Sequence, residues 1–186
     1  MSALQNLPDN FSYLSPIGFK FTLRNFPEVN YFCQSANIPG ISLSTIPIAL
    51  PLKDIEEPGD SVSYEELTIR FIVDENMKNW LSIFDWITAL GFPTPELQKE
   101  RQLLKENMEL KTDAVLTVLT SNMNAQMNFK FQECFPINLS AIQFDSSLTD
   151  VEYVTADVSF RYDIYQVQNL LNNEKSYQGA PINRNA

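Results

Sequence analysis

The chain has 186 residues, a length typical of one domain, and 44% of them are hydrophobic, which is enough apolar surface for a packed core. Its 13 basic and 23 acidic side chains give a formal net charge of −10, which disfavours nucleic-acid binding through clustered Lys and Arg. Residues 1–8 lack the features of a signal peptide, and no apolar run approaches the roughly 18 residues of a membrane span. We expect a soluble protein made in the cytoplasm.

The N-terminal part is predicted to hold an arm followed by strands that prolines interrupt. Residues 1–16 are polar with a few apolar anchors and form the predicted N-terminal arm. Alternating apolar residues predict strands at 19–23 and 29–36, which we interpret as a hairpin. A turn is expected at 38–41, and Pro47 restricts the strand that follows to an edge or a bulge.

The middle of the chain changes from strand to helix. Residues 53–61 are predicted to be a long loop, and 64–73 form the clearest strand, with apolar side chains on one face. Apolar residues at helical spacing then predict an amphipathic helix over 74–91. A second, charged helical segment is expected at 94–112 as an insertion.

The last third of the chain is predicted to consist mainly of consecutive strands. We expect strands at 114–120, 126–134, 138–145 and 152–167 and a flexible, Asn- and Gln-rich tail at 168–186. The fold class is therefore mainly β: a barrel or sandwich of about seven to eight strands at 17–167, with one flanking α-helix and the charged helical segment.

The sequence contains few residues or motifs of the kinds that support catalysis, metal binding or phosphate binding. The chain contains no His, which removes the commonest general base and most zinc sites, and it has no glycine motif that cradles phosphates. Acidic clusters could hold a divalent cation or supply a carboxylate pair, although such residues more often solvate turns or cap helices. These clusters are Asp54, Glu56, Glu57 and Asp60; Asp74 and Glu75; and Asp145, Asp150 and Glu152. We predict no catalytic, cofactor-binding or metal-binding residues and no enzyme activity.

Cysteines and aromatic residues also favour a structural interpretation. Cys33 and Cys134 lie in strand-like runs, so we expect reduced core residues. Cys33 has no basic neighbour in the sequence that would lower its pKa, which disfavours a nucleophile. The remaining candidates lie on one helix and are expected in the core rather than in a ligand pocket: Trp80, Phe84, Trp86 and Ile87.

Several short motifs occur in an informative order. The first motif is the proline and glycine at 38–41 followed by the proline within 46–48, and the second is Pro58-Gly59-Asp60 before Tyr64–Ile69. The third is Asp74-Glu75 followed by Phe84-Asp85-Trp86. The fourth is Phe135-Pro136, Leu139 and Phe144-Asp145 before Val151–Tyr165. This order, over Pro16–Val167, resembles the T4-type tail tube proteins of contractile-tailed phages. The chain departs from that family in its longer 94–112 segment and in the tail after Val167.

The resemblance implies a structural virion protein of a contractile tail, assembled in the host cytoplasm. Six copies would form a ring that stacks on itself and contacts sheath, baseplate or terminator proteins, with DNA passing through the lumen without specific binding. It implies no cofactor and no membrane. One alternative is a specialised paralogue at a tube end, either a baseplate initiator or a tail completion protein; another is the tube protein of a related injection system. From other classes, a monomeric barrel for a small apolar ligand and an enzyme using Asp74 and Glu75 remain open.

Two features bear on such an assembly. Outside residues 94–113 the chain keeps 18 acidic and nine basic side chains, which is consistent with a negative lumen that repels DNA and equally with general solubility. The segments 52–61 and 1–16 are long and polar with isolated apolar anchors. We expect both to reach neighbouring rings.

Overall fold

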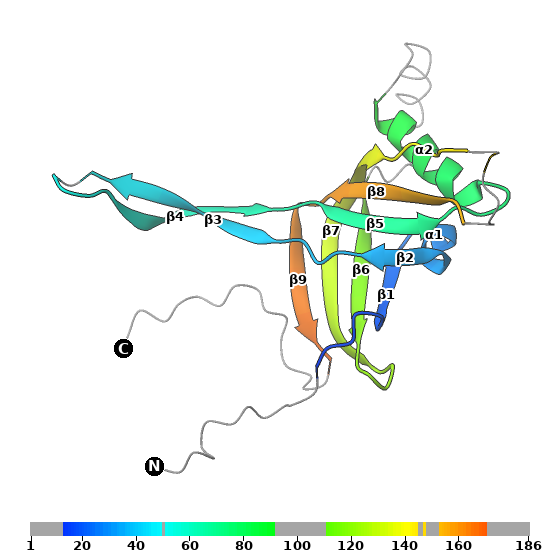
Figure 1. Cartoon of the computed structure of the whole chain (residues 1–186), viewed down its shortest axis with the longest axis horizontal. Helices are drawn as coiled ribbons and strands as arrows, with labels where there is room; N and C mark the ends of the chain where they lie inside the picture. Colours follow the sequence, from blue (N-terminus) through cyan, green and yellow to red (C-terminus); the bar gives the residue numbers. More distant parts are fainter. Residues whose placement is uncertain (1–12, 50, 92–110, 145–146, 148–152, 171–186) are drawn as a thin grey trace.

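The computed structural model describes residues 13–49, 51–91, 111–144, 147 and 153–170, and Figure 1 shows how their elements are arranged. The mainly β fold with a flanking helix is confirmed, with nine strands in the described residues where seven to eight were expected. In chain order the elements are β1 (Phe19–Leu23), α1 (Pro27–Tyr31), β2 (Cys33–Ala36), β3 (Ile41–Ile48), β4 (Ile55–Tyr64), β5 (Leu67–Ile72), α2 (Lys78–Gly91), β6 (Thr112–Leu119), β7 (Ala125–Leu139), β8 (Thr155–Arg161) and β9 (Ile164–Asn169).

Seven of the strands form two layers that share β7. The strand order is β1-β6-β7-β8-β5-β2, and β9 also pairs with β7. Because β7 is 15 residues long, its first part pairs with β6 and β9, whereas its last part pairs with β8. We call β1-β6-β7-β9 sheet A and β7-β8-β5-β2 sheet B. Their outermost strands β1 and β2 do not pair, so the sheet stays open between them.

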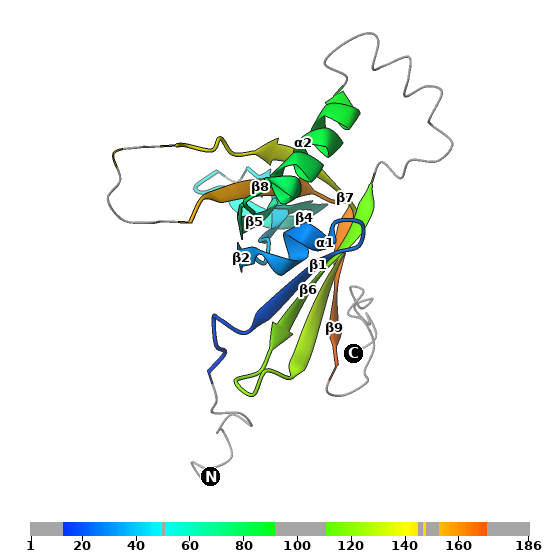
Figure 2. The same ribbon diagram turned by 90° about the vertical axis from the view of Figure 1, so that its right-hand side faces the viewer.

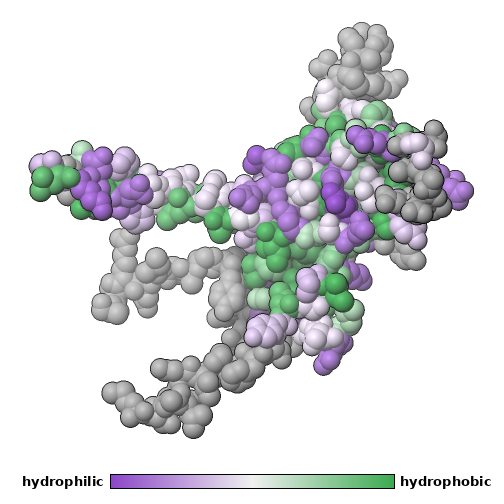
Figure 3. Space-filling model, viewed as in Figure 1, coloured by the Kyte–Doolittle hydropathy of each residue, from purple (hydrophilic) through white to green (hydrophobic). Residues whose placement is uncertain are grey.

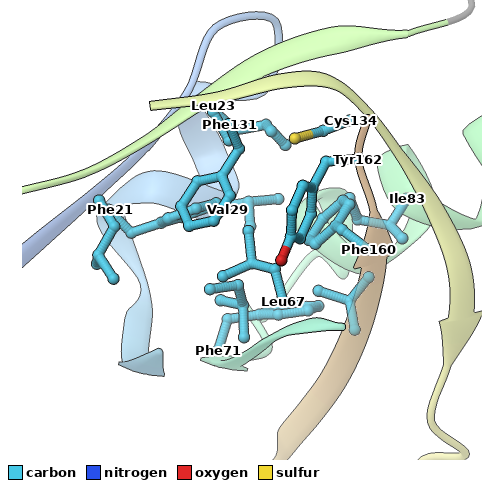
Figure 4. Close-up of a cluster of buried hydrophobic side chains, with 14 of the residues drawn as sticks. Phe21, Leu23, Val29, Leu67, Phe71, Ile83, Phe131, Cys134, Phe160 and Tyr162 are labelled. Atoms are coloured by element: carbon cyan, nitrogen blue, oxygen red, sulfur yellow. The ribbon is translucent and has the colours of Figure 1, made fainter. Parts of the chain in front are cut away.

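The core lies between the two sheets and α2, as Figure 4 shows. Strands β5 and β8 alternate strictly between buried and more exposed residues, which is the period of two expected for a strand with one buried face. Each large apolar side chain buried in this way contributes about 1.5–3 kcal/mol relative to exposure. Among the described residues, the apolar ones with no exposed surface are Val29, Leu67, Ile69, Phe71, Ile83, Phe131, Cys134, Val158 and Phe160.

One buried polar residue fixes the start of α2. The Asn79 side-chain amide donates to the backbone carbonyl of Ile72 at the end of β5, 2.8 Å away. Its side-chain oxygen accepts hydrogen bonds from the backbone amides of Asp74, at 3.3 Å, and Trp80, at 2.8 Å. Asn79 is fully buried, so these bonds satisfy all the polar atoms it brings into the core. The helical spacing of apolar residues in the sequence does not predict this role for Asn79.

The expected hairpin of 19–23 with 29–36 is wrong. Residues Pro27–Tyr31 form the short helix α1 instead, with Pro27 in its first turn, where the fixed φ of proline favours a helix. Strand β1 pairs with β6, and β2 pairs with β5. The two strands therefore lie in different sheets, with α1 as the crossover between them.

Other boundaries also differ from those expected. The loop predicted at 53–61 is largely strand β4, and the strand predicted at 64–73 is split between β4 and β5 by Glu65 and Glu66. The strand predicted at 138–145 ends at Leu139 as the end of β7, and the one at 152–167 is split between β8 and β9. Residues 1–12 of the N-terminal arm, 92–110 of the charged segment and 171–186 of the tail lie outside the described residues. In the described parts, no helix is long and apolar enough to cross a membrane.

Candidate assembly interfaces

Strands β3 and β4 form a ribbon that projects far from the two sheets (Figure 1). We call this ribbon, residues 41–64, the arm, which is a different segment from the predicted N-terminal arm of residues 1–16. All of β3 and all but two residues of β4 are exposed. An isolated two-stranded ribbon is at best marginally stable in water, and about 3.3 Å per residue makes the eight residues of β3 roughly 26 Å long. Such an element is suited to contact another molecule at a distance from its own core.

The arm carries two apolar patches. The distal patch is Ile46, Ile48 and Ile55, which share a face because Ile48 pairs with Ile55 and Ile46 lies two residues before Ile48. The proximal patch is Ile41, Leu43 and Val62. These six side chains are between 39% and 60% exposed, and Figure 3 shows hydrophobic surface both at the tip of the arm and near its base. Exposed apolar groups at this density on a projecting element indicate a protein contact.

The base of the arm is held to the core by tyrosines. Tyr162 donates a hydrogen bond from its hydroxyl to the carbonyl of Glu65, 2.8 Å away, and burial raises the pKa of that hydroxyl. The Tyr64 ring, at the end of β4, lies 5.4 Å from the ring of Tyr165. The amide of Glu65 donates to the carbonyl of Gly40 at 3.0 Å. The arm therefore leaves the core at a fixed position.

A bulge shapes the middle of the arm. The register shifts between Leu43 and Thr45, where Gly59 lies opposite Ser44. A Cβ atom on Gly59 would come within 2.8 Å of the Ser44 carbonyl oxygen. Glycine is needed here because the two backbones approach too closely for a side chain. The Pro58-Gly59-Asp60 motif is thus part of a bulged strand.

Sheet A ends in two unpaired strands. Among the residues that the structure describes, β1 pairs only with β6 and β9 only with β7, so each leaves one edge of backbone amides and carbonyls open there (Figure 2). All pairs in the sheet are antiparallel, so β1 and β9 run in opposite directions. The β9 edge of one copy can therefore meet the β1 edge of the next as an antiparallel pair in a closed ring.

The open face of sheet A is polar and nearly neutral. One row across it runs Lys20, Thr117, Asn128 and Gln168, and the next runs Thr22, Val115, Lys130 and Gln166. The strands of this sheet carry two lysines, Lys20 and Lys130, against two carboxylates, Asp113 and Glu133. Part of the chain's acidic excess lies on the arm, which carries Asp54, Glu56, Glu57 and Asp60 against Lys53.

A groove of mixed polar and apolar lining lies where the sheet stays open between β1 and β2, with Ser15, Gln34 and Ser35 among its polar residues. Its volume is about 580 Å³. Its floor includes Phe19, Leu116 and Val118 from sheet A and Ala36 from β2, and Leu14, Ile17 and Ile38 are among its lining residues. Leu14, Ile17 and Ile38 are 63%, 76% and 46% exposed, so the groove is open to solvent.

The predicted carboxylate candidates are spread through the structure. Asp74 accepts a hydrogen bond from the backbone amide of Asn76, which closes a turn before α2 begins at Lys78, so Asp74 does not cap the helix. Asp145, Asp150 and Glu152 lie outside the described residues. Nowhere in the described ranges do three or more Asp, Glu, Cys or His side chains converge as a metal site would require.

The cysteines and helix aromatics divide between core and surface. Cys134 is fully buried and Cys33 half-buried at the groove, and desolvation raises their pKa values to about 12 and about 11. Both thiols are free. Trp86 lies in the core as expected, and its ring stacks on Phe26 at 4.7 Å. The core prediction is wrong for Phe84, which is 43% exposed and stacks on Trp80 at 5.3 Å.

Comparisons with known proteins point in the same direction as this geometry. Residues 6–168 match the model of a family described as phage tail tube protein. The chain is 26% identical over 142 residues to the tail tube terminator protein of Enterobacteria phage T4, covering 73% of this chain and 76% of that protein. In fold it is similar to the tube terminating cap of the anti-feeding prophage, with a TM-score of 0.61 and 16% identity over 91% of this chain and 99% of that one. It is also similar to a chain of the sheath-tube complex of the PVC extracellular contractile injection system, with a TM-score of 0.56 and 16% identity over 91% and 99% of the two chains.

Proposed function

The chain belongs to the phage tail tube protein family, and we propose that it forms a hexameric ring that ends the tail tube. It is a structural protein of a phage tail or tail-like particle. The terminal role is supported by its likeness to the T4 tail tube terminator, which extends over 142 residues. The resemblance to tube proteins led us to expect the main tube subunit first, and this relative favours the alternative of a specialised protein at a tube end.

The ring is closed by the free edges of sheet A. Strand β1 of one copy pairs with β9 of the next, which satisfies the backbone groups that each edge leaves open. This contact is head-to-tail, and a head-to-tail contact that closes gives a ring. The unpaired, antiparallel β1 and β9 edges are the observation that carries the proposal.

The open face of sheet A then lines the lumen, because its other face is covered by the core. Amide and hydroxyl side chains such as Thr117, Asn128 and Gln168 dominate this face, and the two lysines and two carboxylates of its strands balance. A nearly neutral lining neither repels DNA strongly nor holds its phosphates, and it lets DNA pass without specific binding. The net negative charge of the chain is accordingly interpreted as a solubility feature.

Partners follow from the position at the tube end. One side of the ring contacts the last ring of the tube, and sheath or other tail proteins contact the rest. The protein acts by holding these parts together, with no enzymatic step and no cofactor.

A second candidate function is the binding of a small apolar ligand by a monomer. The groove of about 580 Å³ between β1 and β2 favours it, since ligand sites commonly measure roughly 300–1,000 Å³. A monomer, however, leaves both edges of sheet A and the apolar patches of the arm without partners.

The experiment that separates these functions is negative-stain electron microscopy of the purified chain, combined with mass determination. We expect discrete hexameric rings that do not grow into tubes. Long hollow tubes formed by the chain alone would instead assign it to the main tube. A monomer under every condition, including with other tail proteins present, would leave ligand binding as the better account.

A further inference from the structure

Sheets A and B meet at a corner through which two neighbouring stretches of chain pass together. Strand β7 pairs with β9 up to Gln132 and with β8 from Phe135. The chain from β8 to β9 makes the reverse passage between Arg161 and Ile164. Figure 1 shows β8 and β9 running in clearly different directions on the two sides of this corner. The direction of β9 relative to sheet B is therefore set at the corner.

A bulge bends β7 at this point. The register between β6 and β7 shifts between Thr112 and Ala114, because β7 has one residue more than β6 there. Glu133, in the bulge, has a φ of 57°, and its backbone amide donates to the carboxylate of Asp113 at 3.3 Å. A bulge bends its strand, and a positive φ is unfavourable for a residue other than glycine. The bend thus depends on neighbours that hold Glu133 in place.

Lys111, which directly precedes β6, contacts both passages of the corner. Its Nζ atom lies 3.3 Å from each carboxylate oxygen of Asp163, between β8 and β9, and 3.7 Å from the carboxylate of Glu133. The same atom lies over the ring of Phe135, 5.9 Å from its centre. The backbone amide of Asp163 also donates to the carbonyl of Gln132 at 3.1 Å. One side chain therefore holds β7 and the β8–β9 passage at the same place.

We propose that Lys111 is a positioning residue for ring closure. By holding Asp163 and Glu133 together, it fixes the direction in which β9 presents its free edge to the next copy. In the described residues the backbone of β9 pairs with β7 alone, so its direction follows that of β7 beyond the bulge. The proposal rests on the ring of the proposed function, in which this edge pairs with β1 of the neighbour.

The effect of this cluster is small in one subunit and large in a ring. The side chains of Lys111, Glu133 and Asp163 are 37%, 58% and 59% exposed. An exposed ion pair changes an equilibrium constant by about 1.5- to 5-fold. A roughly threefold loss of correctly directed β9 edges in every copy compounds over six copies to about 700-fold in the assembly constant. Since six monomers form one hexamer, the monomer–hexamer midpoint then moves about fourfold to higher concentration.

The test compares Lys111→Met with Lys111→Arg by sedimentation velocity over a range of concentrations. Methionine keeps an unbranched side chain that can pack on Phe135 but removes the charge, whereas arginine keeps the charge and can bind both carboxylates. We expect Lys111→Met to raise the midpoint about fourfold and Lys111→Arg to stay close to the native chain. The difference between Lys111→Met and the native chain should shrink in about 1 M NaCl, because salt screens the cluster.

Arg70→Met is the matched control. It removes the ion pair of Arg70 with Asp157, whose hydrogen bonds of 2.7 Å and 3.0 Å join β5 to β8. This pair is also exposed but lies within sheet B and not at the corner, so the midpoint should not move. Urea unfolding of the same samples should show that Lys111→Met loses no more subunit stability than Arg70→Met.

The outcomes separate this inference from the ring itself. Native hexamers together with an unshifted midpoint for Lys111→Met would overturn the role of Lys111. A shift that Arg70→Met reproduces, or one that lower subunit stability fully explains, would overturn it as well. Asp163→Asn keeps the size of the side chain and removes its charge, so it should give the same shift, and native assembly by this variant would contradict the proposal. A native chain that forms no hexamers would contradict the proposed function, and this inference with it.

Discussion

Weakening the distal patch of the arm should disassemble the ring without unfolding the subunit. Ile46 and Ile48 share one face of β3 and are 55% and 39% exposed. Full burial of an isoleucine contributes about 1.5–3 kcal/mol, so covering the exposed fractions contributes about 1 kcal/mol for each side chain. The double substitution Ile46→Ser, Ile48→Ser should therefore weaken each interface by about 2 kcal/mol, roughly 30-fold in its equilibrium constant.

The assay is sedimentation velocity or mass photometry over a range of concentrations, with chemical unfolding of the same samples. The subunit itself should keep its stability within about 0.5 kcal/mol, because exposed positions away from core features tolerate substitution. Thr45→Ser, on the other face of the arm, is the matched control and should assemble as the native chain does. Native assembly by the double variant, or an equal loss with Thr45→Ser, would refute the role given to the patch.

Three further predictions concern stability and the arm. Asn79→Ala should destabilise the subunit by about 2–3 kcal/mol in urea unfolding, because it leaves buried backbone groups at the start of α2 without partners; an unchanged midpoint would contradict this. Gly59→Ala should reduce the hexamer fraction in mass photometry with an unchanged Tm, because its Cβ would press on Ser44; normal assembly would show that the bulge is not needed. Burial raises the pKa of Cys134 to about 12 from 9.0, so the thiol stabilises the fold fully below pH 9 and loses this effect as the pH rises toward 12. Cys134→Ala should flatten the fall in the urea midpoint above pH 9, and an identical fall in both proteins would argue against it.

Much of the core could be predicted because its pattern is local. Leu67, Ile69 and Phe71 alternate in one strand, and Trp86 falls on the inner face of an amphipathic helix. These positions depend on the period of the segment alone. The prolines and glycines at 38–41 and 58–60 were also recognised as special, although 38–40 connect β2 to β3 without a defined turn and 58–60 lie within β4.

The remaining features depend on contacts between distant segments, which the period of a single segment does not contain. Alternation at 19–23 and 29–36 gave no information on partners, and β1 pairs instead with β6, more than 90 residues away. Residues 53–61 of the arm were taken for a loop because Pro58 and Gly59 break the expected strand pattern, whereas a bulge accommodates both. Asn79 and the groove arise only when β5, α2, β1 and β2 are brought together.

The proposed position of this protein at the end of the tail tube can be tested most directly with tubes assembled from the tube protein of the same particle. Purified chain would be added to these tubes and imaged by cryo-electron microscopy, with untreated tubes as the control. A hexameric ring of this protein at one end of each tube, and none along its length, is the result we predict. Incorporation along the whole tube, or no density at either end, would contradict its role as the protein that ends the tail tube.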